Sequence, residues 1–301
     1  MLKIENTEVV GFEAAIRGMR NPMNSWDKSD SGWDAHIPPI VLRNQVDWEQ
    51  WAEQYKAVQY SDEYTYDIGP NDRDLMARLR NAGTDHRKFM RMIVVYLDIT
   101  APLYWWKEFD TYKVGTVANS CSTMHKIADK EFDVNGFSHE HIEELGGDEY
   151  NMSYDWLLRT VDILNYYRKK YHTASEKLST DITDAERKHT LAQQKLFWWQ
   201  MIQLLPSSYN QRRTVMLNYE VLANMYKSRC NHKLDEWHTF CDWIERLPYS
   251  ELITGKEEKY MTTTMDAFEL ISERDRMCKS FGNSCRNCPA EKGGHCMALK
   301  L

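Results

Sequence analysis

The spacing of apolar residues along this chain predicts several helices and one clear strand. Residues 90–100 are rich in β-branched and apolar side chains, which is typical of a strand, and a shorter strand is predicted at 8–12. Helical periodicity predicts helices at 48–58, from the 69–72 turn to residue 80, and at 103–110, 155–171, 184–204, 235–245 and 265–278. Together with an extended polar stretch at 112–122, these elements indicate an α/β fold. We expect a twisted, mainly antiparallel sheet flanked by long helices.

The segment 204–237 carries the most informative polar pattern. Residues 214–229 contain neither Gly nor Pro, and we predict that they form one helix. At 100° per residue, Asn218, Leu222, Met225 and Arg229 then share a narrow stripe. A guanidinium fork and an amide in one stripe suit the wall of a site for a polar heterocycle. The alternative is an ordinary amphipathic helix with Arg229 at its polar edge.

Three blocks of sequence occur in an informative order. The first is AAIRGMR at 14–20, and the second, at 75–109, has a helix, a Gly turn, a His-containing loop, a long strand and an Ala-Pro step. The third has Leu205-Pro206 followed by Asn218, Asn224 and Arg229. In this order the blocks resemble the flavin-dependent thymidylate synthases, in which the arginine at the last of these positions holds a uracil ring.

The sequence departs from that family after its Ala-Pro step. The family signature begins Arg-His-Arg, whereas Thr111, Tyr112 and Lys113 stand at those positions here. Later positions of the signature are also replaced, and TYKVGTVANSCSTMH keeps only a polar, hydroxyl-rich pattern. Contacts that arginines make in the family must therefore be made by other groups in this chain.

The resemblance implies a reaction and its cofactors. It implies reductive methylation of dUMP to dTMP, with hydride from reduced FAD, the one-carbon unit from methylenetetrahydrofolate, and NADPH as the reductant. It also implies a homotetramer with active sites between subunits. Two alternatives stay open: a flavin enzyme that modifies another pyrimidine nucleotide, and a non-catalytic nucleotide-binding relative.

The resemblance also assigns roles to residues. Arg229 is expected to donate to a uracil carbonyl and to stabilise charge that develops during the reaction. The candidates for cofactor binding are His86, Asn218, Asn224, Arg17, Arg20 and Tyr112. The candidates for binding the substrate and its phosphate are Glu108, Lys113, Ser120, Cys121, Ser122 and Thr123. For each of them the alternative is a solvated surface group.

Cys121 has a second interpretation because a thiolate can attack C6 of a uracil. Only Lys113 is near enough in sequence to favour the thiolate. The resemblance implies no protein nucleophile.

Composition narrows the class of protein. The chain has 301 residues, a net charge of −7, 42% hydrophobic and 28% charged residues, which is typical of a soluble globular protein. No apolar run reaches the roughly 18 residues of a membrane span, and acidic residues near the N-terminus do not fit a signal peptide, so we expect a cytoplasmic protein. The acidic balance argues against nonspecific nucleic-acid binding. The 11 Trp and 17 Tyr suit stacking on a flavin or base, or large core and subunit-interface side chains.

The last part of the chain has a separate pattern. Cys278, Cys285, Cys288 and Cys296 lie close together among glycines, and four thiolates suit zinc or an iron–sulfur cluster. The alternative is a tail with incidental reduced thiols.

The domain organisation follows from the resemblance and from the position of this tail. We predict a synthase-like domain over residues 1–265, with a surface insertion at about 26–70, and a cysteine-rich tail over 266–301. The sequence contains no GxGxxG or GxxxxGK[ST] motif, which argues against a dinucleotide-binding Rossmann domain or a P-loop.

Overall fold

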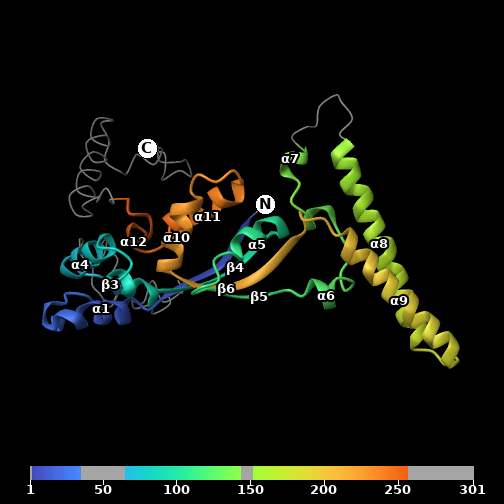
Figure 1. Ribbon diagram of the computed structural model, residues 1–301, viewed down its shortest axis with the longest axis horizontal. Coiled ribbons are helices and arrows are strands. Elements are labelled where there is room, and N and C mark those ends of the chain that lie inside the picture. Colours follow the sequence, from blue (N-terminus) through green and yellow to red (C-terminus); the bar gives the residue numbers. More distant parts are fainter. Residues whose placement is uncertain (1, 35–64, 144–151, 257–301) are drawn as a thin grey trace, which may run out of the picture. The chain divides into compact units, whose positions relative to one another are not determined.

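The computed structural model describes residues 2–34, 65–143 and 152–256. Its centre is a four-stranded sheet in the order β1-β4-β6-β5 (Figure 1). These strands span Lys3–Val10, Val94–Pro102, Asn210–Asn218 and Val117–Ser120, respectively, and each neighbouring pair is antiparallel. The predicted α/β fold with a mainly antiparallel sheet is confirmed.

Strand β6 corrects the prediction that one helix spans residues 214–229. It pairs with β4 from Val94↔Asn218 to Pro102↔Asn210, and β5 pairs with its other edge. The helix α10 begins only at Tyr219 and ends at Arg229. Pairing with β4 along residues 210–218 and with β5 at residues 213–216 satisfies the backbone of this strand, and this long-range pairing outweighs the local helical pattern.

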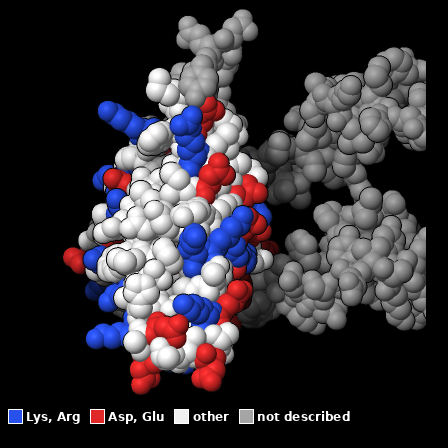
Figure 2. Space-filling view, turned by 90° about the vertical axis from the view of Figure 1, so that its right-hand side faces the viewer, with Lys and Arg blue, Asp and Glu red and all other residues white. Residues whose placement is uncertain are grey.

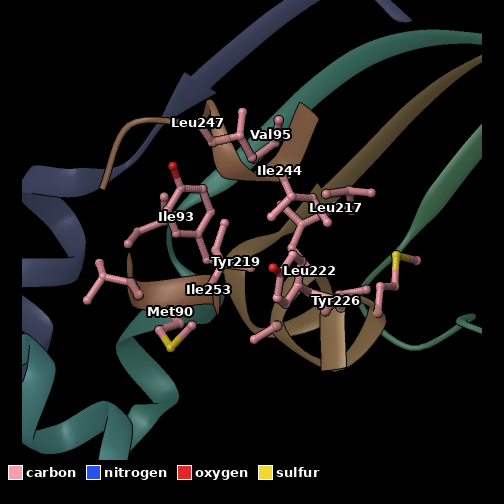
Figure 3. Packing of buried hydrophobic residues seen from close by; sticks show 14 of the residues in the cluster. Met90, Ile93, Val95, Leu217, Tyr219, Leu222, Tyr226, Ile244, Leu247 and Ile253 are labelled. Carbon is pink, nitrogen blue, oxygen red and sulfur yellow. The ribbon is translucent and has the colours of Figure 1, made fainter. Parts of the chain in front are cut away.

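Helices cover one face of the sheet and supply most of the main core (Figure 1). They are α5 (Leu103–Phe109), α10, α11 (Asp235–Glu245) and α12 (Glu251–Thr254), with α1 (Phe12–Arg20) and α4 (Pro70–Asn81) nearby in the same core. Alternate residues of β4, including Val95 and Leu97, are buried against this layer. Figure 3 shows Val95 and Leu217 packed with side chains from α10, α11 and α12.

A second, smaller core lies beside two long helices. Helix α8 spans Met152–Leu178 and α9 spans Asp184–Leu204, and the two pack against each other. Their buried residues contact the segment after β5, which contains α6 (Thr123–Lys126), a 3-10 turn at Val134–Gly136 and α7 (Glu140–Glu143). The start of α9 is fixed by a capping box between Thr183 and Glu186.

The start of α4 is capped from a distant segment. Asp30 accepts backbone hydrogen bonds from Asn71 (2.9 Å) and Asp72 (3.1 Å), which are two of the unpaired donors at the helix start. Gly69 precedes this helix, and a Cβ there would lie 2.3 Å from the Asp30 carboxyl carbon. A side chain at position 69 would therefore displace the cap.

Short elements complete the described chain. Strands β2 (Gly32–Asp34) and β3 (Thr65–Asp67) form a two-stranded ribbon. Short 3-10 helices span Asn21–Met23, Trp26–Lys28 and Arg87–Arg91.

Other sequence predictions have mixed outcomes. Helices α9 and α11 have the predicted bounds, whereas α8 is longer than predicted at both ends. The helices predicted at 48–58 and 265–278 lie outside the described residues. The chain divides into a compact unit of residues 1–255 and a second of 256–301, and the predicted boundary at 265 stays a prediction. Within the described ranges, none of the helices combines the length and the hydropathy needed to span a bilayer.

Candidate functional site

The polar stripe predicted on one helix is divided in the structure. Asn218 is the last residue of β6 and caps α10, because its Oδ1 accepts a 3.0 Å hydrogen bond from the Val221 backbone N–H. Leu222 and Met225 are fully buried in the core. Leu222 and Met225 thus form the apolar side of an amphipathic helix, which was the alternative interpretation of this segment. Of the residues of the stripe that lie in α10, only Arg229 is at the polar edge of the helix.

The guanidinium of Arg229 lies among groups from α5, the following loop and α11. Its Nε donates to the Tyr112 hydroxyl (3.0 Å), and its Nη1 forms an ion pair with Glu108 (2.6 Å). Its central carbon lies 4.9 Å from the centre of the Trp237 ring, within the range of a cation–π contact. These contacts fix the orientation of the guanidinium plane.

The same contacts determine the charge state of Arg229. Burial lowers its pKa, but the hydrogen bonds and charges of Tyr112 and Glu108 outweigh burial, and the pKa is raised above its ordinary value. The side chain of Arg229 is 15% exposed and that of Glu108 is 41% exposed. Arg229 is therefore a permanent, positioned cation that is partly open to solvent.

A pocket of about 280 Å³ lies beside Arg229 and its partner Tyr112. It is lined by Phe109, Asp110, Tyr112, Lys113, Thr116 and Ala118, so Tyr112 contacts both Arg229 and the pocket. The Thr116 hydroxyl is buried without a hydrogen-bond partner among the described residues. A buried, unpaired hydroxyl costs free energy unless a ligand or water satisfies it.

A second arginine, Arg213 on β6, borders the pocket through Asp110. Its Nη1 donates to Asp110 (2.7 Å), and its guanidinium stacks 4.1 Å from the centre of the Trp106 ring. Arg213 was missed because residues 210–213, which precede the predicted helix, were not recognised as part of a strand.

The loop between α5 and β5 lies against the start of α10. Gly115 in this loop has a left-handed φ of +79°, and a Cβ there would lie 3.0 Å from both the Asn218 amide nitrogen and a Val221 methyl. This close approach brings the loop that carries Lys113 next to the Asn218 cap. Lys113 and Asn218, which are far apart in sequence, therefore belong to one region.

The loop that carries His86 contacts α10 through a different residue. His86 is exposed, whereas its neighbour Arg87 forms an ion pair with Glu220 (2.8 Å) and donates to the Asn224 side chain (3.2 Å). Arg87 was missed because the resemblance directed attention to the histidine. The structure thus brings Asn224 and Arg87 together and leaves His86 at the surface.

The predicted phosphate-binding residues do not all line the pocket. Of these candidates, only Lys113 lines it. Ser120 lies on β5, and the Ser122 hydroxyl caps α6 by accepting from the His125 backbone N–H (3.1 Å). Cys121 is exposed, and Thr123 begins α6.

The two arginines of the first sequence block have separate environments. Arg17 is exposed, with its guanidinium 3.8 Å from Glu13. Arg20 is 4% exposed, and its Nε forms a 2.5 Å ion pair with the buried Asp72. The guanidinium of Arg20 thus stabilises the core, and we do not retain the hypothesis that it binds a cofactor.

Metal binding finds no support in the described part of the chain, and the cysteine-rich tail lies outside it. No group of three or more His, Cys, Asp or Glu residues within the described ranges is arranged to hold a metal ion. Zinc or an iron–sulfur cluster held by Cys278, Cys285, Cys288 and Cys296 stays a prediction.

Comparison with known proteins gives structural similarity only. No protein-family model matches the sequence, and no curated protein matches it. The chain is similar to a crystal structure of the flavin-dependent thymidylate synthase ThyX from Helicobacter pylori in complex with FAD and dUMP. The identity is 14% and the TM-score 0.49, over 85% of this chain and 98% of that one. A second structure of Thymidylate Synthase X from Helicobacter pylori with FAD and dUMP gives 13% identity, the same TM-score and the same coverage. Similarity at this level does not assign a function to the chain.

Proposed function

We propose that this protein is a flavin-dependent enzyme that transfers a one-carbon group to C5 of a pyrimidine deoxynucleotide, converting dUMP to dTMP. One observation carries the proposal. Two of the sequence blocks used for the resemblance meet around Arg229. Glu108 lies near the end of one block, Tyr112 lies three residues after that block, and Arg229 lies in the other. Residues more than a hundred positions apart thus form one polar site beside a pocket.

The pocket residues fit the phosphorylated end of a nucleotide. Lys113 supplies a cation, and Thr116 supplies a buried hydroxyl without a partner among the described residues. A phosphate oxygen accepts hydrogen bonds from both kinds of group. The volume of about 280 Å³ lies just below the usual range for small-molecule sites, roughly 300–1,000 Å³, so one end of a nucleotide fits and a whole FAD extends beyond it.

Arg229 is the residue that we propose for the pyrimidine ring. Its fork can donate two hydrogen bonds to a planar acceptor, and Glu108 and Tyr112 hold that fork in place. When bound, a reduced flavin and methylenetetrahydrofolate supply the hydride and the carbon. Arg229 stabilises negative charge on the pyrimidine carbonyl oxygen, in a geometry set before the reaction begins.

The flavin needs surface outside this pocket. Asn224 and Arg87 lie together on the exposed side of α10 and offer amide and guanidinium donors. Asn218 lies at the start of α10, next to Gly115 of the loop between α5 and β5. We propose Asn224, Arg87 and Asn218 as the flavin-facing residues of this chain.

Glu108 is compatible with a second substrate class. A carboxylate beside Arg229 can accept a hydrogen bond from N3–H of uracil or from the 4-amino group of cytosine. A cytosine nucleotide therefore remains a second candidate substrate. Titrating dUMP and dCMP against the same protein separates the two candidates directly.

The proposal is tested by flavin spectroscopy on the full chain. FAD absorbance is titrated with and without dUMP, and NADPH is then added to follow bleaching of the flavin. We expect FAD to bind, dUMP to perturb its spectrum, and dTMP to form when methylenetetrahydrofolate is present. Absence of FAD binding under both conditions would overturn the proposal and favour a non-catalytic nucleotide-binding protein. FAD binding without dTMP formation would instead favour another substrate.

A further inference from the structure

A second cavity, of about 520 Å³, has no role in the proposed function. It lies between the segment that follows β5, which contains α6, and the helices α8 and α9 (Figure 1). In the part of the chain that the structure describes, it shares no lining residue with the pocket beside Arg229. Its volume falls within the range of roughly 300–1,000 Å³ that is usual for small-molecule sites, so the cavity can hold a ligand of its own.

The wall of the cavity formed by residues 124–129 is held in place by side chains of α8 and α9. Arg168 Nε donates to the Ala128 carbonyl (2.9 Å), and His172 Nε2 lies 2.7 Å from the same oxygen. Trp198 Nε1 donates to the Met124 carbonyl (2.9 Å). Side chains of two helices thus fix this short segment, and a cavity that is formed before a ligand arrives costs less to fill.

The apolar part of the cavity suits a planar ring. Tyr171 and Trp198 both line it, together with Met124, Ile127 and Ala128. Aromatic side chains stack on nucleobases, because every base has a π-face. A thioether such as that of Met124 also packs favourably against a ring. The lining therefore favours a flat heteroaromatic ligand.

Two polar side chains, four positions apart in the chain, add hydrogen-bonding groups. His125 and Asp129 both line the cavity. Asp129 is paired with Lys126 (2.9 Å), but their side chains are 51% and 70% exposed, so this ion pair is weak and can be exchanged for a ligand. A carboxylate has two oxygens that accept hydrogen bonds side by side. It therefore selects a ring edge with two adjacent donors.

We propose that this cavity binds a guanine nucleotide such as GMP, independently of the proposed function. Guanine presents two adjacent donors, N1–H and the 2-amino group, whereas adenine does not. In this arrangement both groups donate to Asp129, the ring stacks on Trp198 and Tyr171, and His125 can donate to the O6 carbonyl.

Two exposed lysines suit the phosphate of the nucleotide. Lys126 and Lys130 flank Asp129 in the chain, and both are exposed. An ammonium is a compact charge on a flexible stem, so it can follow a phosphate at the rim of the cavity. When Asp129 turns to the base, Lys126 is released for the phosphate.

The surface charge favours a free nucleotide over a nucleic-acid strand. Figure 2 views the molecule from the side on which α8 and α9 lie in Figure 1, and shows Lys and Arg interspersed with Asp and Glu around an uncharged area. A nucleic-acid strand requires a continuous basic surface, and the chain has a net charge of −7. A pterin carries the same pair of donors as guanine, so the test includes a pterin.

Calorimetric titration of the full chain with GMP, without flavin or dUMP, tests the proposal. We expect GMP to bind, and inosine monophosphate, which lacks the 2-amino group, to bind roughly tenfold or more weakly. Asp129→Asn should weaken GMP binding by about tenfold or more. The same variant should gain affinity for xanthosine monophosphate, because the Asn amide can donate to the 2-oxo group that replaces the 2-amino group. Asp162→Asn is the matched control, since Asp162 is an exposed acid of α8 that does not line the cavity.

A second variant tests the stacking wall. Trp198→Ala should weaken GMP binding by roughly tenfold or more, whereas Trp156→Ala should not, because Trp156 is 70% exposed and lies outside the cavity lining. Circular dichroism confirms that the variants are folded.

Four results would overturn the proposal. The first is the absence of GMP binding, and the second is equal affinity for GMP and inosine monophosphate. The third is displacement of GMP by excess dUMP, because the nucleotide would then occupy the pocket beside Arg229. The fourth is tighter binding of 6-hydroxymethylpterin than of GMP, which would contradict the assignment to guanine.

Discussion

The buried ion pair between Arg20 and Asp72 gives a prediction that separates a structural role from cofactor binding. The two side chains are only 5% and 0% exposed, and the Asp72 carboxylate also accepts hydrogen bonds from the Ser29 (2.6 Å) and Ser31 (2.7 Å) hydroxyls. This cluster joins α1, the segment before β2 and α4. Its loss should therefore destabilise the fold.

The size of the effect follows from burial. Removing one partner of a buried ion pair typically costs about 3–5 kcal/mol, because the other charge stays buried without compensation. For a folded unit of this size, 1 kcal/mol shifts Tm by about 2–4 °C, so we expect Tm to fall by roughly 10 °C. Asp72→Ala should cost more than Arg20→Met, because it also leaves the two serine hydroxyls without their acceptor. The double variant Arg20→Met/Asp72→Leu should recover part of the loss.

The pair also makes stability depend on pH. Burial raises the pKa of Asp72, but hydrogen bonds from Ser29, Ser31 and Arg20 outweigh it, and the pKa lies below its ordinary value of 3.8. A carboxyl whose pKa is lower in the folded state stabilises the protein above its unfolded pKa, and this contribution is lost as pH falls through the folded value. Below about pH 4, the wild type should therefore lose more stability than Asp72→Asn.

Urea unfolding followed by circular dichroism, together with FAD titration of the same variants, decides the question. We expect Arg20→Met to unfold at lower urea concentration and, where folded, to bind FAD like the wild type. Unchanged unfolding together with a large loss of FAD affinity would refute the structural role. It would restore the hypothesis that Arg20 binds the cofactor.

Three further substitutions test the arrangement around α10. Tyr112→Phe removes a hydrogen bond to Arg229 and should weaken nucleotide binding by roughly tenfold or less in calorimetry, because the site is partly exposed. Asn218→Ala removes the α10 cap and should lower unfolding free energy by about 1 kcal/mol in urea titrations; an unchanged midpoint would contradict the capping role. Gly115→Ala forces a Cβ into a left-handed conformation 3.0 Å from Asn218, and thermal unfolding should show a destabilisation of about 1 kcal/mol or more.

Local signals in the sequence located several elements well. The bounds of α9 follow from the capping residue Thr183, its partner Glu186 and the Leu205-Pro206 step after the helix. The apolar residues of β4 identified a central strand. These predictions succeeded because the signals lie within one turn or one strand of the element that they define.

Strand β6 could not be assigned in the same way. Residues 214–218 join an apolar run that continues into a true helix, and only pairing with β4 and β5 makes them a strand. Asn218 was the available local signal, since an asparagine followed by helical periodicity is typical of an N-cap. The cap of α4 by Asp30 is equally non-local, because about forty residues separate the two.

The candidate site was predicted in part. The resemblance identified Arg229, Tyr112 and Lys113, and the structure brings Arg229 and Tyr112 into contact beside a pocket that Lys113 lines. The resemblance could not reveal Arg213 or Thr116, because the positions of these residues depend on the pairing of β5 with β6 and on the turn at Gly115. Their roles, and those of the other candidates, stay proposals.

The rate of dTMP formation shows whether Arg229 stabilises charge on a bound pyrimidine, as proposed above. The rate is measured with FAD, NADPH, methylenetetrahydrofolate and saturating dUMP for the wild type, Arg229→Ala and Arg229→Lys. Arg78→Ala is the matched control, because the Arg78 side chain is 69% exposed on α4.

We expect Arg229→Ala to reduce turnover by about 10²–10³-fold, the usual loss for one donor to a developing oxyanion. Arg229→Lys should recover only part of the rate, because an ammonium cannot reproduce the guanidinium fork, and Arg78→Ala should match the wild type. Full turnover and full dUMP affinity in Arg229→Ala would show that Arg229 neither binds the pyrimidine nor stabilises its charge.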